Sequence, residues 1–298
     1  MTDRDHIVDS FKSLQDHICS NLERLDGHGQ FKEDPWMRPG GGGGRTRIIQ
    51  GQRIEKGGVN FSAVHGPMPE RITNALGIEP TSFFATGVSI VLHPVNPHVP
   101  IIHMNVRYFE TESGLWWFGG GIDMTPHYVV EGDARIFHTT LKEVCDKHNE
   151  RYYPEFKMWA DDYFYIKHRK ETRGIGGIFF DRLNADKGEK SELFKFVMDV
   201  GYAFIPCYEA PFEKHKDDAV TERDKHWQFN RRGRYAEFNL VWDKGTKFGL
   251  DTDGNIESIL MSLPPQVEWT YKYPYNEKER QTLALLRKEI DWVNYTEA

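Results

Sequence analysis

The chain has 298 residues, which fits two average domains or one large one at about 150 residues per domain. Lysine and arginine number 38 against 45 aspartates and glutamates, so the formal net charge is −7, and sequence-independent nucleic-acid binding, which needs a basic face, is excluded. The apolar fraction of 39% excludes global disorder, and no stretch of about 18 apolar residues predicts a transmembrane segment.

The cysteines and the first residues predict a cytoplasmic protein. Cys19, Cys145 and Cys207 are odd in number and far apart, so neither a disulfide framework nor a zinc knuckle is indicated. The N-terminal segment carries early acids and lacks the apolar run of a secretory signal. We expect three reduced, mostly buried thiols.

Residues 1–30 are predicted to hold an amphipathic helix, because apolar residues recur there at steps of three and four. An unbroken glycine run follows at residues 40–44. A flexible loop is favoured over a phosphate-binding loop, because no G-K-[ST] follows. The alternative is a glycine lid that approaches an anion together with Arg45 and Arg47.

The sequence pattern in the middle of the chain is typical of β-strands. Apolar and polar residues alternate at hairpin spacing from 81 to 126, which predicts an antiparallel meander. The runs GIGGIFF and RYAEFNLVW are predicted as further strands, ESILMSLPP as extended chain, and residues 276–293 as a C-terminal amphipathic helix. No repeat or linker emerges, so residues 1–298 are expected to form one α+β domain around a large antiparallel sheet.

The strand over residues 101–109 carries the best local candidate for chemistry. His103, Asn105 and Arg107 share one face, and the other face is apolar. Ser89 and His93 fall on the same face if the neighbouring strand pairs in register. An imidazole can move protons and a guanidinium can bind a carboxylate, which suits an acidic substrate. A solvated polar sheet face is the alternative.

Two further features leave alternatives open. Asp123 follows three glycines inside a predicted strand, which mark either a bulge or the close approach of a ligand, and it is either a base or a turn cap. The histidines that could bind a metal lack any short ligand motif and give a weak signal. They are His93, His103, His138 and His168.

Several long motifs together resemble the oxygen-dependent coproporphyrinogen III oxidases of haem biosynthesis. The most telling is KMWADDYFYIKHRKETRGIGGIFFD at residues 157–181. The runs GGGGGRTRIIQGQRIEKGGVNFSAVHG, HMNVRYFE, WFGGGIDMTP and RYAEFNLVWDKGTKFGL match further family blocks in the same order, over about residues 30 to 270. Motifs of this length exclude a chance match.

The resemblance implies a large antiparallel sheet with helices on both faces, assembled as a homodimer. The implied activity converts two propionates of coproporphyrinogen III to vinyl groups and gives protoporphyrinogen IX. O₂ is the oxidant, CO₂ and hydrogen peroxide are released, and no cofactor is required. Some bacterial members are described as binding a divalent metal, and the four histidines above match those positions.

The resemblance also implies roles for single residues. His103 matches the proton donor, Ser89 and Asn105 to Arg107 match substrate contacts, and Asp123 matches the aspartate that engages the pyrrole N–H groups. The substrate-binding residues implied are Ser89, Asn105, Val106, Arg107, Asp253, Gly254 and Asn255. We assign Asp123 as base, His103 as proton donor and Arg107 as anion clamp, with Arg45 and Arg47 as further cationic contacts.

The sequence departs from the family pattern at two places. Ala160 stands where the signature usually has cysteine, so no thiol at that position is essential here. The turn that often carries a basic residue reads Asp253, Gly254, Asn255, which leaves the backbone of Gly254 as the contact there. The rival interpretations are a metal-dependent version of the reaction and a non-catalytic tetrapyrrole carrier.

Overall fold

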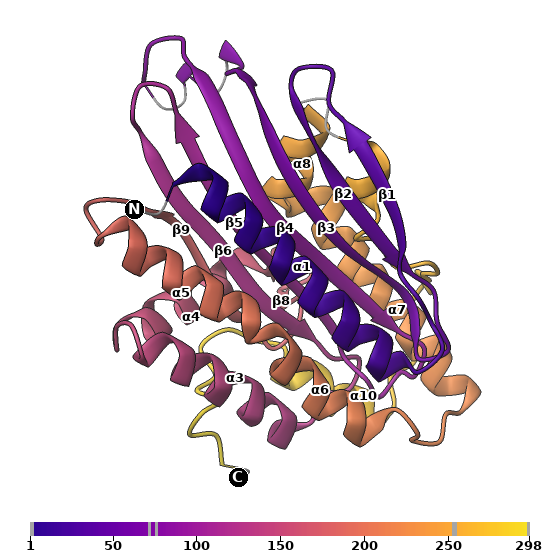
Figure 1. Cartoon of the computed structure of the whole chain (residues 1–298). Helices are drawn as coiled ribbons and strands as arrows, with labels where there is room; N and C mark the ends of the chain where they lie inside the picture. Colours follow the sequence, from indigo (N-terminus) through magenta and orange to yellow (C-terminus); the bar gives the residue numbers. More distant parts are fainter. Residues whose placement is uncertain (1–2, 71–72, 75–76, 252–254, 297–298) are drawn as a thin grey trace.

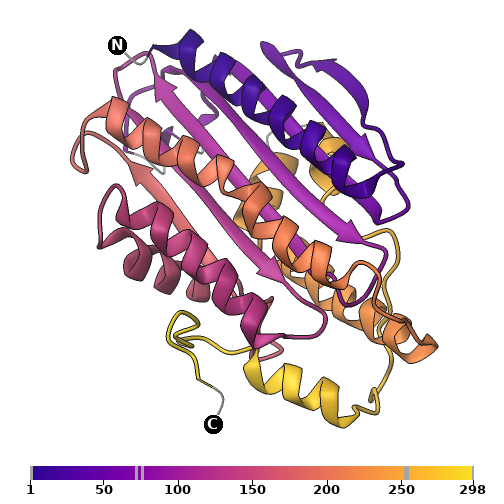
Figure 2. The ribbon, with the colours of Figure 1, turned by 60° about the horizontal axis from the view of Figure 1, so that its bottom comes forward.

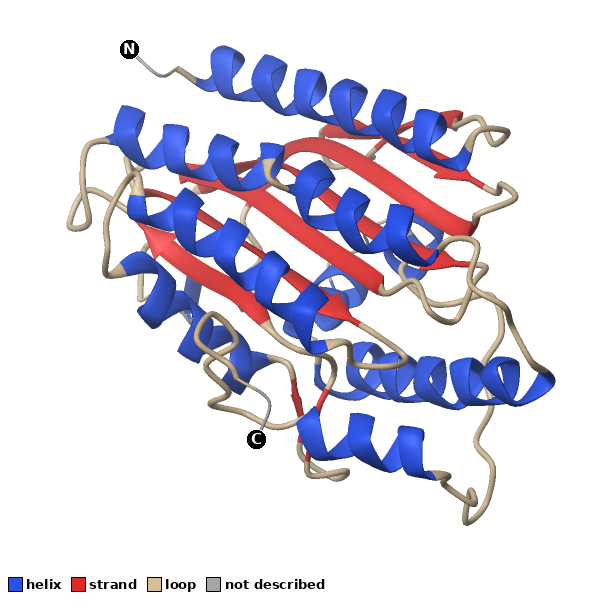
Figure 3. Ribbon diagram, turned by 90° about the horizontal axis from the view of Figure 1, so that it is seen from below, coloured by secondary structure: helices blue, strands red, loops and turns tan. Residues whose placement is uncertain are grey.

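A seven-stranded antiparallel sheet forms the centre of the molecule, and helices cover both of its faces (Figures 1 and 3). The computed structural model describes residues 3–70, 73–74, 77–251 and 255–296. The strand order is β1-β2-β3-β4-β5-β6-β9, and every neighbouring pair is antiparallel. This architecture confirms the predicted α+β class and the single domain.

The sheet strands are β1 Lys32–Met37, β2 Gly42–Ile49, β3 Ile54–Pro67, β4 Ser82–Pro94, β5 Ile101–Thr111, β6 Trp116–Thr125 and β9 Gly177–Leu183. A separate pair is β7 Tyr165–Ile166 with β8 Glu171–Thr172. The helices are α1 Arg4–Asp26, α3 Glu131–Asp146, α4 Tyr152–Tyr163, α5 Lys190–Tyr202, α6 Phe204–His215, α7 Glu222–Glu237, the π-helix η1 Phe238–Trp242, α8 Lys244–Asp251, α9 Ile256–Leu260 and α10 Glu277–Leu285. Among the described residues, no helix is both long and apolar enough to cross a bilayer.

One face of the sheet, here called the core face, is apolar. It carries Val59, Ile90 and Met104 from successive strands, all fully buried. Helices α1 and α3 lie over this face on either side of α5 and α6, which follow each other end to end (Figure 2), and their apolar stripes join the same hydrophobic cluster. The predicted N-terminal helix is thereby confirmed, since its apolar stripe is the part that α1 buries.

The opposite face, here called the polar face, carries the odd-numbered residues of β4 and β5, including Ser89, His103 and Arg107. Helix α7 and the segment around α9 lie over part of it. Asn60 Nδ2 donates to the Ser258 carbonyl, which holds α9 against β3. The two faces differ because side chains alternate along each strand.

The glycine run is not the flexible loop that we predicted. Gly42, Gly43 and Gly44 begin β2 and pair with both β1 and β3. A Cβ on Gly44 would lie 2.3 Å from the Trp36 ring, so glycine is needed there for that ring to pack on the sheet. Strand β1 forms one edge of the sheet, and Pro35 lies within it.

Three other predicted elements differ from the structure. RYAEFNLVW is helical and not a strand, because it spans the end of α7 and η1. Although its residues alternate like those of a strand, Tyr235 packs from the helix against His93 of β4. ESILMSLPP begins inside α9 rather than in extended chain, and Asn255 caps the first turn of this helix by accepting from the Ser258 N–H. The C-terminal helix predicted for residues 276–293 ends at Leu285, because the following backbone bonds elsewhere: Leu286 O accepts from Thr172 N and Glu289 N donates to Asp161.

Asp26 anchors the end of α1 to the turn before β3. Its carboxylate accepts from the backbone N–H groups of Gly29, Gln52, Arg53 and Ile54 at 2.7–3.2 Å. Burial raises the pKa of Asp26, but these four bonds outweigh it, and the pKa lies below its ordinary value of 3.8. The ionised carboxylate therefore stabilises the fold.

We expect Asp26→Asn to lower the free energy of unfolding by about 2–4 kcal/mol at neutral pH, because buried N–H donors lose a charged acceptor. Since the folded-state pKa is depressed, the wild-type advantage is complete above about pH 5 and is lost as the pH falls through the folded-state pKa. Urea denaturation of both proteins between about pH 7 and 2.5 measures this. A difference that stays constant over that range contradicts the role of the ionised carboxylate.

Candidate functional site

His103 and Asp123 form a pair on the polar face. They lie directly opposite each other on β5 and β6. The His103 Nδ1 and Asp123 Oδ1 atoms are 2.8 Å apart. The Asp123 side chain is 1% exposed, whereas that of His103 is 23% exposed. Because Nδ1 is engaged by the carboxylate, proton exchange between His103 and a ligand would use Nε2.

Arg173 binds the carboxylate of Asp123 in addition to His103. Its Nη2 donates to both oxygens of Asp123, at 2.7 and 2.8 Å, and its Nη1 donates to Asn239 Oδ1 at 2.8 Å. The guanidinium carbon lies 4.4–4.7 Å from the ring centroids of Phe164, Tyr235 and Phe238. The side chain is fully enclosed between the sheet and the C-terminal helices.

The network His103–Asp123–Arg173 keeps a buried carboxylate charged. Burial raises the pKa of Asp123, but the charge of Arg173 and the hydrogen bond from His103 outweigh it, so that this pKa lies below its ordinary value. Sequence reasoning did not single out Arg173. The available signal was a lone arginine directly before the Gly-rich strand GIGG, where a side chain can fold back across the neighbouring strand.

Arg107 lies on the same face of β5 as His103, four residues further along the strand. Its Nη1 donates to Asn105 Oδ1 at 2.7 Å and its Nη2 to Asp181 Oδ1 at 2.9 Å. The side chains of Arg107 and Asp181 are 35% and 32% exposed, so both reach solvent. Asn105 pairs with Ser89, and the predicted alignment of Ser89, His103, Asn105 and Arg107 on one face is confirmed.

The glycines before Asp123 make room for protein atoms. A Cβ on Gly119 would lie 2.5 Å from Asp181 Oδ1 and 2.8 Å from Arg107 Nε. A Cβ on Gly120 would lie 2.8 Å from the Phe180 ring. The close approach that we predicted at this strand is therefore made by the protein's own side chains.

Several predicted site residues lie elsewhere. Val106 is fully buried on the core face, so its side chain cannot contact a ligand on the polar face. Arg45 and Arg47 also belong to the core-face side of β2, where Asp16 of α1 pairs with both. The glycine lid with two free arginines is therefore wrong.

His93 falls on the polar face as predicted, but α7 covers it. Its Nε2 lies 2.9 Å from the Ser262 carbonyl, and its ring meets the Tyr235 ring edge-on at 5.4 Å. Burial lowers the pKa of His93 well below its ordinary value, so the ring is neutral. It can shape the site only through its packing.

The four histidines do not come together as a metal site. His138 bonds the Tyr153 hydroxyl and the Ile175 carbonyl, and burial lowers its pKa to about 3. His168 bonds Glu237 and accepts from the Trp242 ring N–H. Within the described parts of the chain, no three His, Cys, Asp or Glu side chains are arranged to hold a metal ion.

Of the predicted substrate-binding turn at residues 253–255, the structure describes only Asn255. Asp253 and Gly254 lie outside the described residues. Asn255 caps α9 over the polar face, with its side chain accepting from the Ser258 N–H. Its carboxamide oxygen is therefore already used by the protein.

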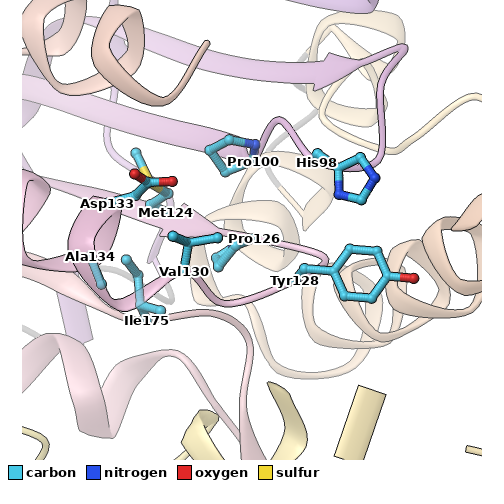
Figure 4. A pocket seen from close by; sticks show the side chains of 9 residues that line it. All are labelled: His98, Pro100, Met124, Pro126, Tyr128, Val130, Asp133, Ala134 and Ile175. Atoms are coloured by element: carbon cyan, nitrogen blue, oxygen red, sulfur yellow. The ribbon is translucent and has the colours of Figure 1, made fainter. Parts of the chain in front are cut away.

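A small cavity lies near the end of β6 and the start of α3 (Figure 4). Met124, His98, Tyr128 and Asp133 are among its lining residues. Its volume is about 10 Å³, room for about one water molecule. It cannot admit an organic substrate. The candidate site is therefore placed by the side chains themselves, at the His103–Asp123–Arg173 network beside Arg107 on the polar face.

Comparison with known proteins gives consistent matches. The family model described as coproporphyrinogen III oxidase matches residues 6–292. The chain is 46% identical to the oxygen-dependent coproporphyrinogen-III oxidase of Prochlorococcus marinus (strain NATL1A), covering 94% of this chain and 88% of that protein. It is 50% identical to the mitochondrial protein of that name from Mus musculus, covering 94% and 67%. It is 49% identical to the chloroplastic protein from Glycine max, covering 95% and 77%.

The buried pair predicts strong thermodynamic coupling. Arg173→Met leaves Asp123 charged without a full partner, and we expect it to lower the free energy of unfolding by about 3–5 kcal/mol. Asp123→Asn should lower the free energy of unfolding less in the Arg173→Met background than in the wild-type protein. Urea denaturation of the four proteins measures this coupling. Arg24→Met, which removes the exposed Arg24–Glu209 pair, serves as the control and should cost about 1 kcal/mol or less. Additive effects of the two changes contradict the network.

Proposed function

The chain belongs to the coproporphyrinogen III oxidase family, and we propose from this membership and the site on the polar face that it oxidatively decarboxylates coproporphyrinogen III. Two propionates become vinyl groups, giving protoporphyrinogen IX for haem biosynthesis. The observation that carries the proposal is the His103–Asp123 pair beside Arg107 on one sheet face, in a chain with this family match.

Each step balances with O₂ as the oxidant. A propionate loses CO₂ and its β-carbon loses two electrons and one proton, forming the vinyl double bond. O₂ takes the two electrons together with two protons, of which one comes from solvent, and leaves as hydrogen peroxide. The porphyrinogen is electron-rich, which supports direct reaction with O₂ once a pyrrole N–H proton is removed. We therefore propose that no organic cofactor or metal is required.

Arg107 serves as the clamp for a substrate carboxylate in this proposal. A guanidinium can hold a carboxylate through two parallel N–H bonds, and about a third of the Arg107 side chain is exposed. The remaining substrate contacts rest on the family resemblance. They are Ser89 and Asn105 by their side chains, Val106 through its backbone, and Asp253, Gly254 and Asn255.

His103 and Asp123 act as one acid–base unit. The carboxylate fixes the imidazole through Nδ1, so Nε2 can take and return a proton at the substrate. Direct contact between Asp123 and the pyrrole N–H groups, which the family resemblance implies, would require Arg173 or His103 to give way. We therefore assign proton transfer to His103 and its positioning to Asp123.

We further propose a cytoplasmic homodimer. The three cysteines are free and buried, which supports a reducing compartment. The dimer rests on the family resemblance. A single monomeric species in sedimentation velocity at the working concentration would contradict it.

Turnover under air and without oxygen tests the activity. We expect protoporphyrinogen IX and CO₂ to form from coproporphyrinogen III only under air, at the same rate in metal-analysed, chelator-treated protein. Product analysis with an oxygen electrode measures both. Substrate binding without oxygen uptake would indicate a carrier, and activity lost on chelation but restored by a divalent ion would indicate the metal-dependent reaction.

The acid–base unit predicts non-additive kinetics. We expect His103→Gln and Asp123→Asn each to lower kcat by about 10²–10⁴-fold, the usual contribution of a positioned proton carrier, with a smaller effect on KM. Because the two residues act together, the double variant should be no slower than the slower single variant. Steady-state kinetics well below each variant's Tm test this. Effects that multiply in the double variant contradict a shared role.

A further inference from the structure

Arg107 is already paired with a carboxylate of the protein itself. Its Nη2 donates to Asp181 Oδ1 at 2.9 Å, while Asn105 holds Nη1. Both partners of the ion pair are about one third exposed, so the pair lies at the open part of the polar face. A substrate carboxylate that binds Arg107 Nη2 must therefore replace Asp181 there.

A β-bulge places Asp181 there. Phe118 of β6 pairs with Leu183, but Gly120 pairs with Phe180, so Asp181 and Arg182 together face Gly119. Arg182 has a φ of 52°, in the left-handed region that disfavours side-chain-bearing residues. Bulges occur next to active sites, where they re-aim a side chain.

Gly119 supplies the third part of this arrangement. Any side chain there would collide with both charged groups, since an added Cβ would come within 2.5 Å of Asp181 Oδ1 and 2.8 Å of Arg107 Nε. The bulge, the left-handed backbone conformation of Arg182 and the absence of a side chain at Gly119 therefore all permit the Arg107–Asp181 ion pair. That contact is an ion pair open to solvent, which contributes little to stability.

We propose that Asp181 is an internal carboxylate that occupies Arg107 until a carboxylate of the substrate replaces it. The inference rests on the proposed function, in which Arg107 binds a propionate. Asp181 is then a specificity-determining residue. It keeps the Arg107 side chain extended over Gly119. Only a ligand with a carboxylate can then replace Asp181 as the partner of Arg107.

The energetics of exchange favour this role. An exposed ion pair is weak, so a substrate carboxylate can displace Asp181 at small cost. The apparent Kd of the substrate nevertheless rises, because only the molecules in which Arg107 is not held by Asp181 can bind the substrate carboxylate. A ligand without a carboxylate gains nothing from breaking the pair. Removing the charge of Asp181 should therefore tighten the binding of polycarboxylate ligands.

The test uses coproporphyrin III, the oxidised macrocycle with the same four propionates, as the ligand in a binding titration. We expect Asp181→Asn to lower its Kd by about two- to tenfold at low salt, measured by porphyrin fluorescence titration of the full-length protein. The gain should shrink at about 0.5 M salt, where charges are screened. KM for coproporphyrinogen III should fall in parallel, with a smaller change in kcat.

Two matched variants separate this role from net charge. Glu209→Gln removes the same charge from the Arg24–Glu209 pair on the helices of the core face, and it should leave Kd within about twofold of wild type. Asp181→Glu keeps the carboxylate and should retain a Kd closer to wild type than Asp181→Asn does.

Other results overturn the proposal. A Kd for Asp181→Asn equal to or above that of wild type, in a variant with wild-type Tm, contradicts it, and so does an equal gain in Glu209→Gln. The proposed function fails separately: wild-type protein that binds coproporphyrin III but consumes no oxygen with coproporphyrinogen III refutes the activity, while the Kd comparison still decides the role of Asp181.

Discussion

The ion pair between Arg173 and Asp123 is the interaction on which the site depends. Taking two charges out of water is costly, and the pair repays this only through short, well-aligned bonds and complete enclosure. Arg173 meets those conditions by bonding Asp123 and Asn239 while three aromatic rings surround its guanidinium. The sheet and η1 are thereby joined at the point where Asp123 orients His103.

The antiparallel register decides which residues share that environment. His103 faces Asp123, and Asn105 faces Ser89, because β4, β5 and β6 pair without interruption along this stretch. A slip of one residue would send every side chain to the opposite face and bring Val106 beside the ligand. The buried apolar row on the core face makes such a slip very costly, so the hydrophobic core also fixes the geometry of the polar face.

Residues whose position follows from strand alternation could be predicted from the sequence. His103, Asn105 and Arg107 are of this kind, because a period of two needs no knowledge of neighbouring elements. The face of Arg45 could not be predicted, since it depends on how β2 pairs with β3. RYAEFNLVW alternates like a strand yet forms a helix, because packing of Tyr235 and Asn239 under the sheet overrides local preference. The long motifs indicated the family but not which side chains meet.

The edge strand β1 has a consequence for the behaviour of the protein at high concentration. An unpaired strand edge presents free N–H and C=O groups on which another sheet can add, which is a route to aggregation. Lys32, Glu33 and Asp34 place three charged side chains along this edge, and Pro35 lacks a backbone N–H donor. Helix α4 packs against β9 at the other edge. Both margins of the sheet are thus protected from pairing with the strands of other copies.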